Sequence, residues 1–480
     1  MTLSQIAIFA IVGLVYAALI PARWRGWMLY VVSLIAIYAL QPTLNIRWLD
    51  YSLPTATLLL AAGGWWLTRP TPDSESPPTS RRDDLIALMV MITVALLLTV
   101  SRYIELPFTL TSRPPEITSA ALALVTALGI TALIGVLPSR LRLTAGILLL
   151  VGLFIVIKSP PLATAASAFL RQRTAQDASL ASPVDLGWLG FSYVAFRLIH
   201  TLRDRQMGIL PAVGLREYLT YVIFFPAYTA GPIDRLERFH TDYIGLRHIR
   251  GLDPVRIIDA GQRIAIGLLK KFVVADSLAV FSLNETLAAQ AQTSGALWFA
   301  LYAYAFRLLF DFSGYTDIAI GISLLFGIRL PENFTRPYLR SNITAFWQSW
   351  HITLSNWARF YIYSPVSRSL LRRKPKLPNL LIILICNLLT MGVIGLWHGI
   401  TLPFAIWGLW HATGLTIHKL WSDRTRSWYR ALQADKPRRR LWNAAGVLLT
   451  FHFVLLGWIW FALPDFESAT SVLRRLLGLG

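Results

Sequence analysis

Two histidines beside tryptophans are the side chains best suited to chemistry in this sequence. His351 follows Trp350, and His398 follows Trp397 in a later segment. Both segments are strongly apolar, and an ionisable side chain is costly where water is scarce unless it has a function. An imidazole can take a proton from a hydroxyl and release it again, because its unperturbed pKa lies near neutrality. The pair therefore predicts acid–base chemistry inside an apolar protein.

The surroundings of the two histidines differ. Gly395 and Gly399 flank His398, and glycine lets backbones approach closely, which favours a general base facing a passage through the bilayer. His351 has a second interpretation as a histidine that only packs. Ser355 lies four residues beyond it, but no nucleophile elbow or oxyanion device surrounds that serine, so we do not predict a serine nucleophile. At 100° per residue, a continuous helix would place on the face of His351 the residues Trp347, Trp350, Leu354 and Trp357.

Carboxylates in an apolar segment form a second group. Arg307 lies four residues before Asp311, which predicts an ion pair on one helix face. No partner for Asp317 is evident from the sequence. Either Asp317 and Ser313 contact a substrate, or with Gly314 they let this helix pack closely against a neighbour.

A proline-bounded loop follows. Pro331 and Pro337 cannot both continue a helix, so the segment is predicted to be a re-entrant turn or an interfacial bend that presents Asn333. His411 and His418 lack the i,i+4 spacing of helical zinc ligands, and no metal site is predicted. The single Cys386 excludes an intramolecular disulfide.

The elements that position these residues are expected to be membrane helices. Of the 480 residues 55% are hydrophobic and 15% charged, with a mean hydropathy of +0.53. This composition predicts an all-α polytopic protein of the plasma membrane with about eleven to thirteen helices, some of them short, broken or re-entrant. The first helix is expected to be retained, because no signal-peptide cleavage site follows it. The clearest apolar runs are 6–20, 28–40, 85–100, 117–137, 143–157, 380–396 and 447–463.

The organisation along the chain suggests three parts. Residues 1–186 are predicted to form N-terminal transmembrane helices, with a flexible proline- and serine-rich loop near 69–84. Residues 187–420 are predicted to form the catalytic core, and residues 421–480 a basic loop and a C-terminal helix. The stretch 160–183, small and polar with a proline near each end, is predicted to be irregular.

The net charge of +20 arises from 45 Lys and Arg against 25 Asp and Glu. Basic loops are typical of the cytoplasmic side of membrane proteins, so we do not predict nucleic-acid binding. Such loops could also hold an acidic protein or anionic lipid headgroups.

Taken together, the motifs resemble the membrane-bound O-acyltransferase family, and within it the bacterial branch of teichoic acid D-alanyl transfer and alginate O-acetylation proteins. The resemblance covers about 187–461 and departs from the family at Gln348-Ser349 and in the loose match over 361–365. The motifs that carry it, in family order, are 190–197, 225–235, 310–317, 331–334, 346–355, 396–399 and 456–461.

The resemblance implies a helical bundle around a tunnel in which an activated acyl group passes to a hydroxyl of a cell-envelope polymer or glycolipid. It implies His398 as the catalytic histidine and His351 as a second essential one. It implies no bound cofactor, and a thioester donor carried on phosphopantetheine or coenzyme. The residues expected to line the substrate site are Trp350, Ser355, Asn333, Asp317, Ser313 and Trp397.

Partners and rivals follow from the same resemblance. Besides the lipid bilayer, a D-alanyl or acyl carrier protein at the cytoplasmic face, or a periplasmic or extracellular acyltransferase, is expected. Acetyl transfer to an alginate-like exopolysaccharide is the alternative within the family. A transporter or scaffold whose histidines only pack is the alternative from another class, although no inverted repeat is evident.

Overall fold

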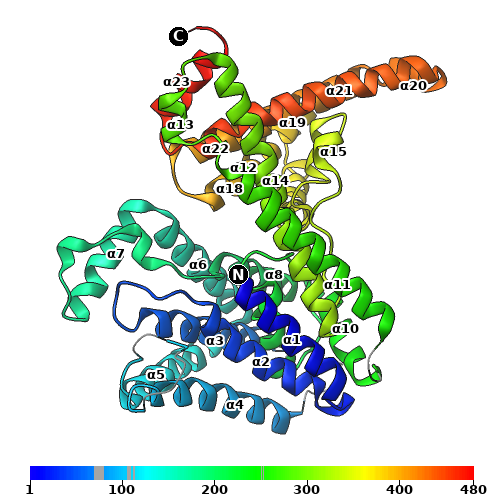
Figure 1. The fold of residues 1–480 in the computed structure, drawn as a ribbon. Coiled ribbons are helices and arrows are strands. Elements are labelled where there is room, and N and C mark those ends of the chain that lie inside the picture. The colour runs from blue at the N-terminus through cyan, green and yellow to red at the C-terminus, as the bar shows by residue number, and fades with distance from the viewer. Residues whose placement is uncertain (70–79, 105–109, 112–113, 250, 252, 480) are drawn as a thin grey trace. The chain divides into compact units, whose positions relative to one another are not determined.

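The chain folds into helices joined by short connections. A computed structural model describes residues 1–69, 80–104, 110–111, 114–249, 251 and 253–479, and in these ranges it contains helices and no strand (Figure 1). One isolated antiparallel bridge joins Phe334 to Trp350. The all-α class expected from the sequence is confirmed. Most of the predicted proline- and serine-rich loop lies outside the described residues.

Six helices are long and apolar enough to cross a bilayer, which confirms a multi-pass membrane protein. A seventh apolar helix, α1 (Leu3–Leu19), is shorter. The total of eleven to thirteen membrane helices stays a prediction, because the other helices are shorter or more polar. The six are α4 (Arg81–Val100), α5 (Ile117–Gly135), α6 (Ser139–Lys158), α14 (Ser294–Leu325), α18 (Asn379–His398) and α21 (Lys436–Gly457), the last continued by α22 (Ile459–Ala462).

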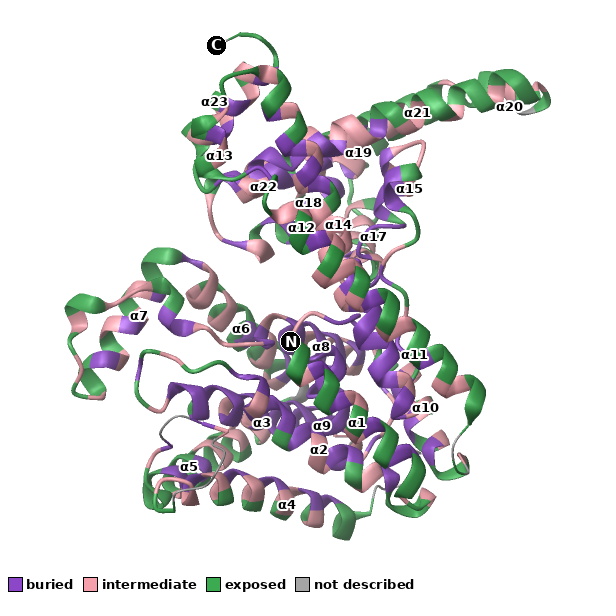
Figure 2. Cartoon of the chain, viewed as in Figure 1, coloured by how far each residue is buried: buried purple, intermediate pink, exposed green. Residues whose placement is uncertain are grey.

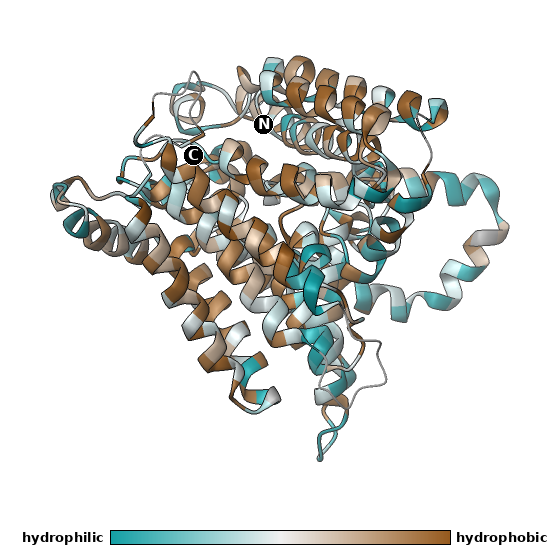
Figure 3. Ribbon diagram, turned by 90° about the horizontal axis from the view of Figure 1, so that it is seen from below, coloured by the Kyte–Doolittle hydropathy of each residue, from teal (hydrophilic) through white to brown (hydrophobic). Residues whose placement is uncertain are grey.

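The surface of these helices explains why they need lipid. In α5 only Ala120 and Leu124 are buried, whereas Leu122, Val125 and Leu133 are exposed. Exposure of so many large apolar side chains is unfavourable in water but favourable against lipid acyl chains. Figure 3 shows the same property as long helices coloured mainly for hydrophobic residues.

The chain divides into two compact units. Unit 1 comprises 1–264 and 318–330, and unit 2 comprises 265–317 and 331–480. The three-part organisation expected from the sequence stays a prediction. The core of unit 1 is formed by α2 (Arg25–Leu40), α3 (Leu49–Thr68), α8 (Phe191–Gln206) and α9 (Leu215–Val222), where buried residues are most frequent (Figure 2).

A buried arginine holds the irregular backbone of unit 1 after α9. Arg197 is 2% exposed and donates hydrogen bonds of 2.8 Å to the carbonyl oxygens of Val222 and Ala227. These carbonyls lie where the helix ends, so that they lack helical partners. The guanidinium therefore supplies the hydrogen bonds that water would give these carbonyl oxygens at a surface.

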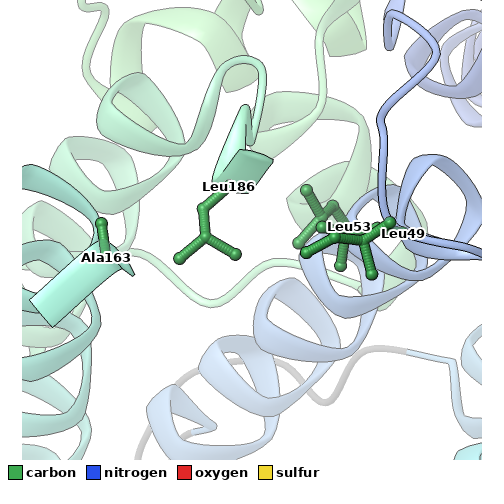
Figure 4. Close-up of a cluster of buried hydrophobic side chains, with 5 residues drawn as sticks. Leu49, Leu53, Ala163 and Leu186 are labelled. Carbon is green, nitrogen blue, oxygen red and sulfur yellow. The ribbon is translucent and has the colours of Figure 1, made fainter. Parts of the chain in front are cut away.

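The prediction of an irregular stretch over 160–183 was wrong, because α7 spans Pro160–Arg173. Its prolines occupy the first turn, where a missing N–H costs nothing, so they begin this helix rather than break it. Ala163 belongs to a buried hydrophobic cluster with Leu49 and Leu53 of α3 and with Leu186 (Figure 4). Arg171, on the same helix, pairs with Asp185 at 2.9 Å.

Unit 2 contains the residues singled out for chemistry. Its central pair is α18 with α19 (Leu402–Arg424). A Cβ added at Gly395 would lie 2.4 Å from the carbonyl oxygen of Phe404, and one at Gly408 would lie 2.7 Å from that of Met391. The two helices thus pack backbone to backbone, as small residues permit in membranes. Shorter elements complete the unit: α13 (Glu285–Gln290), α15 (Ile343–Trp347), α16 (Ile352–Ala358), α17 (Ser364–Leu371), α20 (Arg426–Ala434) and α23 (Phe466–Leu476).

Candidate active site

His351 lies between two short helices, not within one. α15 ends at Trp347 and α16 begins at Ile352, and His351 itself has φ 42° and ψ 55°, a left-handed conformation. The predicted continuous helical face from Trp347 to Trp357 was therefore wrong. The backbone pairs with a neighbouring loop instead: Ile352 N–H donates to the carbonyl of Asn333 at 3.0 Å. A left-handed non-glycine residue costs about 1–2 kcal/mol, a strain that is often found at functional sites.

Asn333 fixes this turn. Its side chain is fully buried, and its Oδ1 accepts hydrogen bonds from the hydroxyl of Thr353 at 2.6 Å and from the Thr353 N–H at 3.3 Å. The Nδ2 of Asn333 has no hydrogen-bond partner within the described ranges. Asn333 thus holds the backbone beside His351, and its amide donor is left for another group.

The imidazole of His351 lies in an aromatic environment. It is 2% exposed, and its ring centroid lies 4.7 Å from that of Phe312 and 6.0 Å from that of Trp397. Burial lowers the pKa of His351, which lies outside the six candidate spans, from 6.5 to about 3. The ring is therefore neutral at physiological pH. Its Nε2 is buried without a partner among the described residues, a costly state that a bound polar group would relieve.

His398 is the last residue of α18, and it is only partly buried. Its ring centroid lies 4.5 Å from that of Trp397 and 4.6 Å from that of Phe461. Trp397 is therefore a neighbour of both imidazoles, His351 and His398. The arrangement combines a buried neutral histidine with a more accessible one.

Sequence reasoning missed the aromatic layer behind His398. Trp407 packs edge-on against His398 at 5.5 Å and contacts His411 at 4.8 Å. His411 is fully buried and accepts a hydrogen bond from Trp347 Nε1 at 3.3 Å. The available signal was the i,i+4 spacing of Trp407 and His411, which places both on one face of α19.

The acidic residues are paired with lysines that the sequence did not suggest. Asp317 pairs with Lys270 at 2.6 Å and Asp311 with Lys271 at 3.1 Å. The predicted Arg307–Asp311 ion pair was wrong: no ion pair joins these two in the described structure, because the π-helical segment Leu269–Ala275 brings the Lys271 ammonium to Asp311 instead.

Close packing explains why these lysines reach the carboxylates. A Cβ at Gly314 would lie 2.9 Å from the carbonyl oxygen of Gly267. Ser313 and Asp317, both buried, belong to this packed region, which favours their structural interpretation. Contact of Ser313 or Asp317 with a substrate stays a prediction.

Two further predicted lining residues have packing partners. Trp350 is buried, and its ring centroid lies 5.7 Å from those of Tyr338 and Phe346 in stacked geometry. The Ser355 hydroxyl donates to the carbonyl of Trp350 at 3.3 Å. Both residues therefore support the turn that carries His351, and direct contact with a substrate stays a prediction for them too.

Comparison with known proteins assigns this region to a family. The model of the membrane-bound O-acyltransferase family matches residues 184–459, more than half of the chain. The match includes both histidines, Asn333 and the aromatic layer.

The relatives are named for acyl transfer to teichoic acid, peptidoglycan or alginate. The chain is 32% identical to the teichoic acid D-alanyltransferase of Streptococcus thermophilus over 290 residues, 58% of this chain and 68% of that protein. It is 35% identical to the peptidoglycan O-acetyltransferase of Helicobacter pylori over 271 residues, 55% of this chain and 47% of that protein. A probable alginate O-acetylase of Pseudomonas aeruginosa is 33% identical over 61% of this chain and 52% of its own length. The matches thus span about half the length of the two O-acetylation relatives.

Proposed function

The chain belongs to the membrane-bound O-acyltransferase family, and from this premise we propose that it transfers an activated acyl group to hydroxyls of a cell-envelope polymer or glycolipid. The observation that carries the proposal is the contact of Trp397 with both imidazoles, one of which has a buried Nε2 without a partner in the described structure. A substrate hydroxyl is a group of the right size and polarity to satisfy such a nitrogen.

His398 is the proposed general base. Its imidazole takes the proton of the acceptor hydroxyl while the hydroxyl oxygen attacks the acyl carbonyl carbon. The tetrahedral intermediate then expels the thiolate, which receives a proton, and the acyl ester is the product. General-base catalysis of this kind contributes about 10² to 10⁴ in rate, and alignment of the two substrates adds to it.

His351 is the proposed assistant of this step. Because its pKa is lowered to about 3, the ring stays neutral and accepts or relays a hydrogen bond without adding a positive charge to the site. The hydrogen bonds of Ile352 and Thr353 to Asn333 fix the position of the backbone that carries this ring. Positioning of this kind is a large part of the rate enhancement that an active site provides.

The donor is proposed to be a thioester on a phosphopantetheine carrier or on coenzyme A. A thioester is already activated, and the general base and substrate alignment supply the help that it needs. An acidic carrier domain would be attracted by the basic connections, and a periplasmic or extracellular acyltransferase could accept the product. D-alanyl and acetyl groups both occur in the names of relatives, so the proposal extends to either.

The test is acyl transfer in membranes that contain the full chain. We expect His398→Ala to lower the rate of acyl incorporation into the acceptor by about 10² to 10⁴, and His351→Ala to lower it by at least tenfold. The matched control is His248→Ala, because His248 is an exposed histidine outside the site. Transfer at the wild-type rate by a His398→Ala protein that inserts normally would contradict the proposal and favour a transporter or scaffold.

A further inference from the structure

A cavity of about 670 Å³ lies in unit 2 among α15, α19, α20 and α21. Its lining does not include Phe312, Trp397, Phe404, Trp407 or Phe461, the rings described as neighbours of His351 and His398. Its walls are largely apolar or aromatic, including Ile417, Trp421, Tyr429, Trp442, Leu449 and Phe453. A volume of this size is typical of ligand sites, which are mostly apolar with a few polar groups that fix orientation.

One cation borders this cavity without a carboxylate partner. Arg426, at the start of α20, is a lining residue, and no ion pair involves it in the part of the chain that the structure describes. The two acidic residues nearest in sequence are taken: Asp423 pairs with Lys419 at 2.5 Å and Asp435 with Arg438 at 3.2 Å. The Arg426 guanidinium is therefore available to an anion at the cavity.

The surroundings place the cavity at the level where a bilayer meets water. The candidate span 436–462 begins with Lys436 and a run of three arginines, continues with Trp442 and then becomes apolar. Trp442 stacks on Trp421 with ring centroids 6.4 Å apart and packs edge-on against Trp428 at 4.9 Å. Tryptophans mark membrane–water interfaces, and basic clusters beside a span attract anionic lipids.

We propose that this cavity binds one anionic phospholipid. Its acyl chain lies along Ile417, Leu449 and Phe453, and its phosphate accepts hydrogen bonds from Arg426. The predominance of apolar side chains over polar ones such as Asn443 and Ser422 favours a hydrocarbon chain over the more polar pantetheine arm. The unpaired cation and the basic run before Trp442 favour a net negative headgroup over a zwitterionic one.

Native mass spectrometry of the full chain in detergent tests the headgroup. The protein is titrated with dioleoylphosphatidylglycerol or dioleoylphosphatidylcholine, in both cases at physiological salt. We expect tighter binding of phosphatidylglycerol, and we expect Arg426→Gln to weaken it about tenfold, the effect of losing a hydrogen bond to a charged group. Arg430→Gln is the matched control: it removes the same charge from the same helix, but Arg430 does not line the cavity. Its effect is expected to stay below about twofold, because Arg430 makes no lining contact with the bound headgroup and its charge acts only through screened solvent.

A second pair of variants tests occupancy of the cavity. Ala445 lines it, whereas its neighbour Ala444 is exposed and does not. We expect Ala445→Phe to reduce the fraction of protein that retains phosphatidylglycerol, and Ala444→Phe to leave it unchanged. Inorganic phosphate at millimolar concentration is expected not to displace the lipid, since it lacks the acyl chain.

Three results would overturn the proposal. Equal losses from Arg426→Gln and Arg430→Gln would mean that only the general basic surface attracts the lipid. Equal retention of phosphatidylcholine would mean an apolar cavity without headgroup selection. Displacement by inorganic phosphate would mean a free-anion site.

Discussion

The long N-terminal helices and the broken segment around His351 satisfy their backbone hydrogen-bonding groups in different ways. In α5 and α6 the backbone groups of the helix interior are satisfied within the helix, and many apolar side chains are exposed. Around His351 the helices contain five and seven residues, and Asn333 and the hydroxyl of Thr353 are needed to complete the bonding. Regular helices tolerate lipid, whereas the broken backbone here needs polar side chains, which also fix the backbone beside His351.

We therefore expect the loss of a buried polar contact in unit 2 to lower the free energy of unfolding. The buried ion pair should show the largest effect. We expect Lys270→Met to lower the free energy of unfolding by about 3 kcal/mol, because it leaves the Asp317 carboxylate, 7% exposed, without its cation. Lys271→Met is expected to cost about 1 kcal/mol or less, since the Asp311 side chain is 41% exposed. Thermal unfolding in detergent measures both, and equal losses would show that burial does not distinguish the two pairs.

Two glycines compare the close helix packing of unit 2 with the open surface of α5. A Cβ at Gly395 meets the carbonyl of Phe404, whereas one at Gly129 in α5 meets nothing within 4 Å. We expect Gly395→Ala to destabilise the protein by about 1–3 kcal/mol through overpacking. Gly129→Ala should instead stabilise it by about 0.5–1 kcal/mol, the helix preference of alanine. The melting temperatures of the two variants should therefore move in opposite directions. A shift of the same sign would contradict the predicted difference in packing at the two glycines.

Substitution of two capping asparagines distinguishes a role in positioning His351 from a role in stability alone. Asn333 holds the turn at His351, and Asn284 caps α13 by accepting a hydrogen bond from the Leu287 N–H. We expect Asn333→Ala and Asn284→Ala each to cost about 1 kcal/mol in stability. Only Asn333→Ala is expected to lower acyl transfer, by about tenfold, because it releases the backbone beside His351. If both variants retain the wild-type rate at equal protein level, Asn333 is structural alone.

The sequence predicted the fold class and the principal residues because hydropathy and motif order are local properties. Apolar runs of spanning length identified α4, α5, α6 and α18. Both histidines and Asn333 stand out because they are unusual in apolar sequence, and their roles at a site stay predictions. Local patterns failed at His351, where pairing with residue 333 overrides the helical period.

Long-range contacts account for the other differences. The partners of Asp311 and Asp317 come from a segment about forty residues earlier in the chain, so i,i+4 spacing pointed to Arg307 instead. The stretch 160–183 was predicted to be irregular, although proline suits the first turn of a helix, where α7 places it. The contacts of His398 with Trp407 and Phe461 depend on tertiary packing, which no spacing reveals.

A double-mutant cycle on His351 and His398 tests whether the two imidazoles share one site. Acyl transfer from a thioester donor would be measured in membranes for His351→Ala, His398→Ala and the double variant at equal protein level. If the two imidazoles act on one hydroxyl, the double variant should be no slower than His398→Ala by more than about twofold, since residues that act as a unit are non-additive. Losses that multiply, or single variants that keep the wild-type rate, would contradict a shared site.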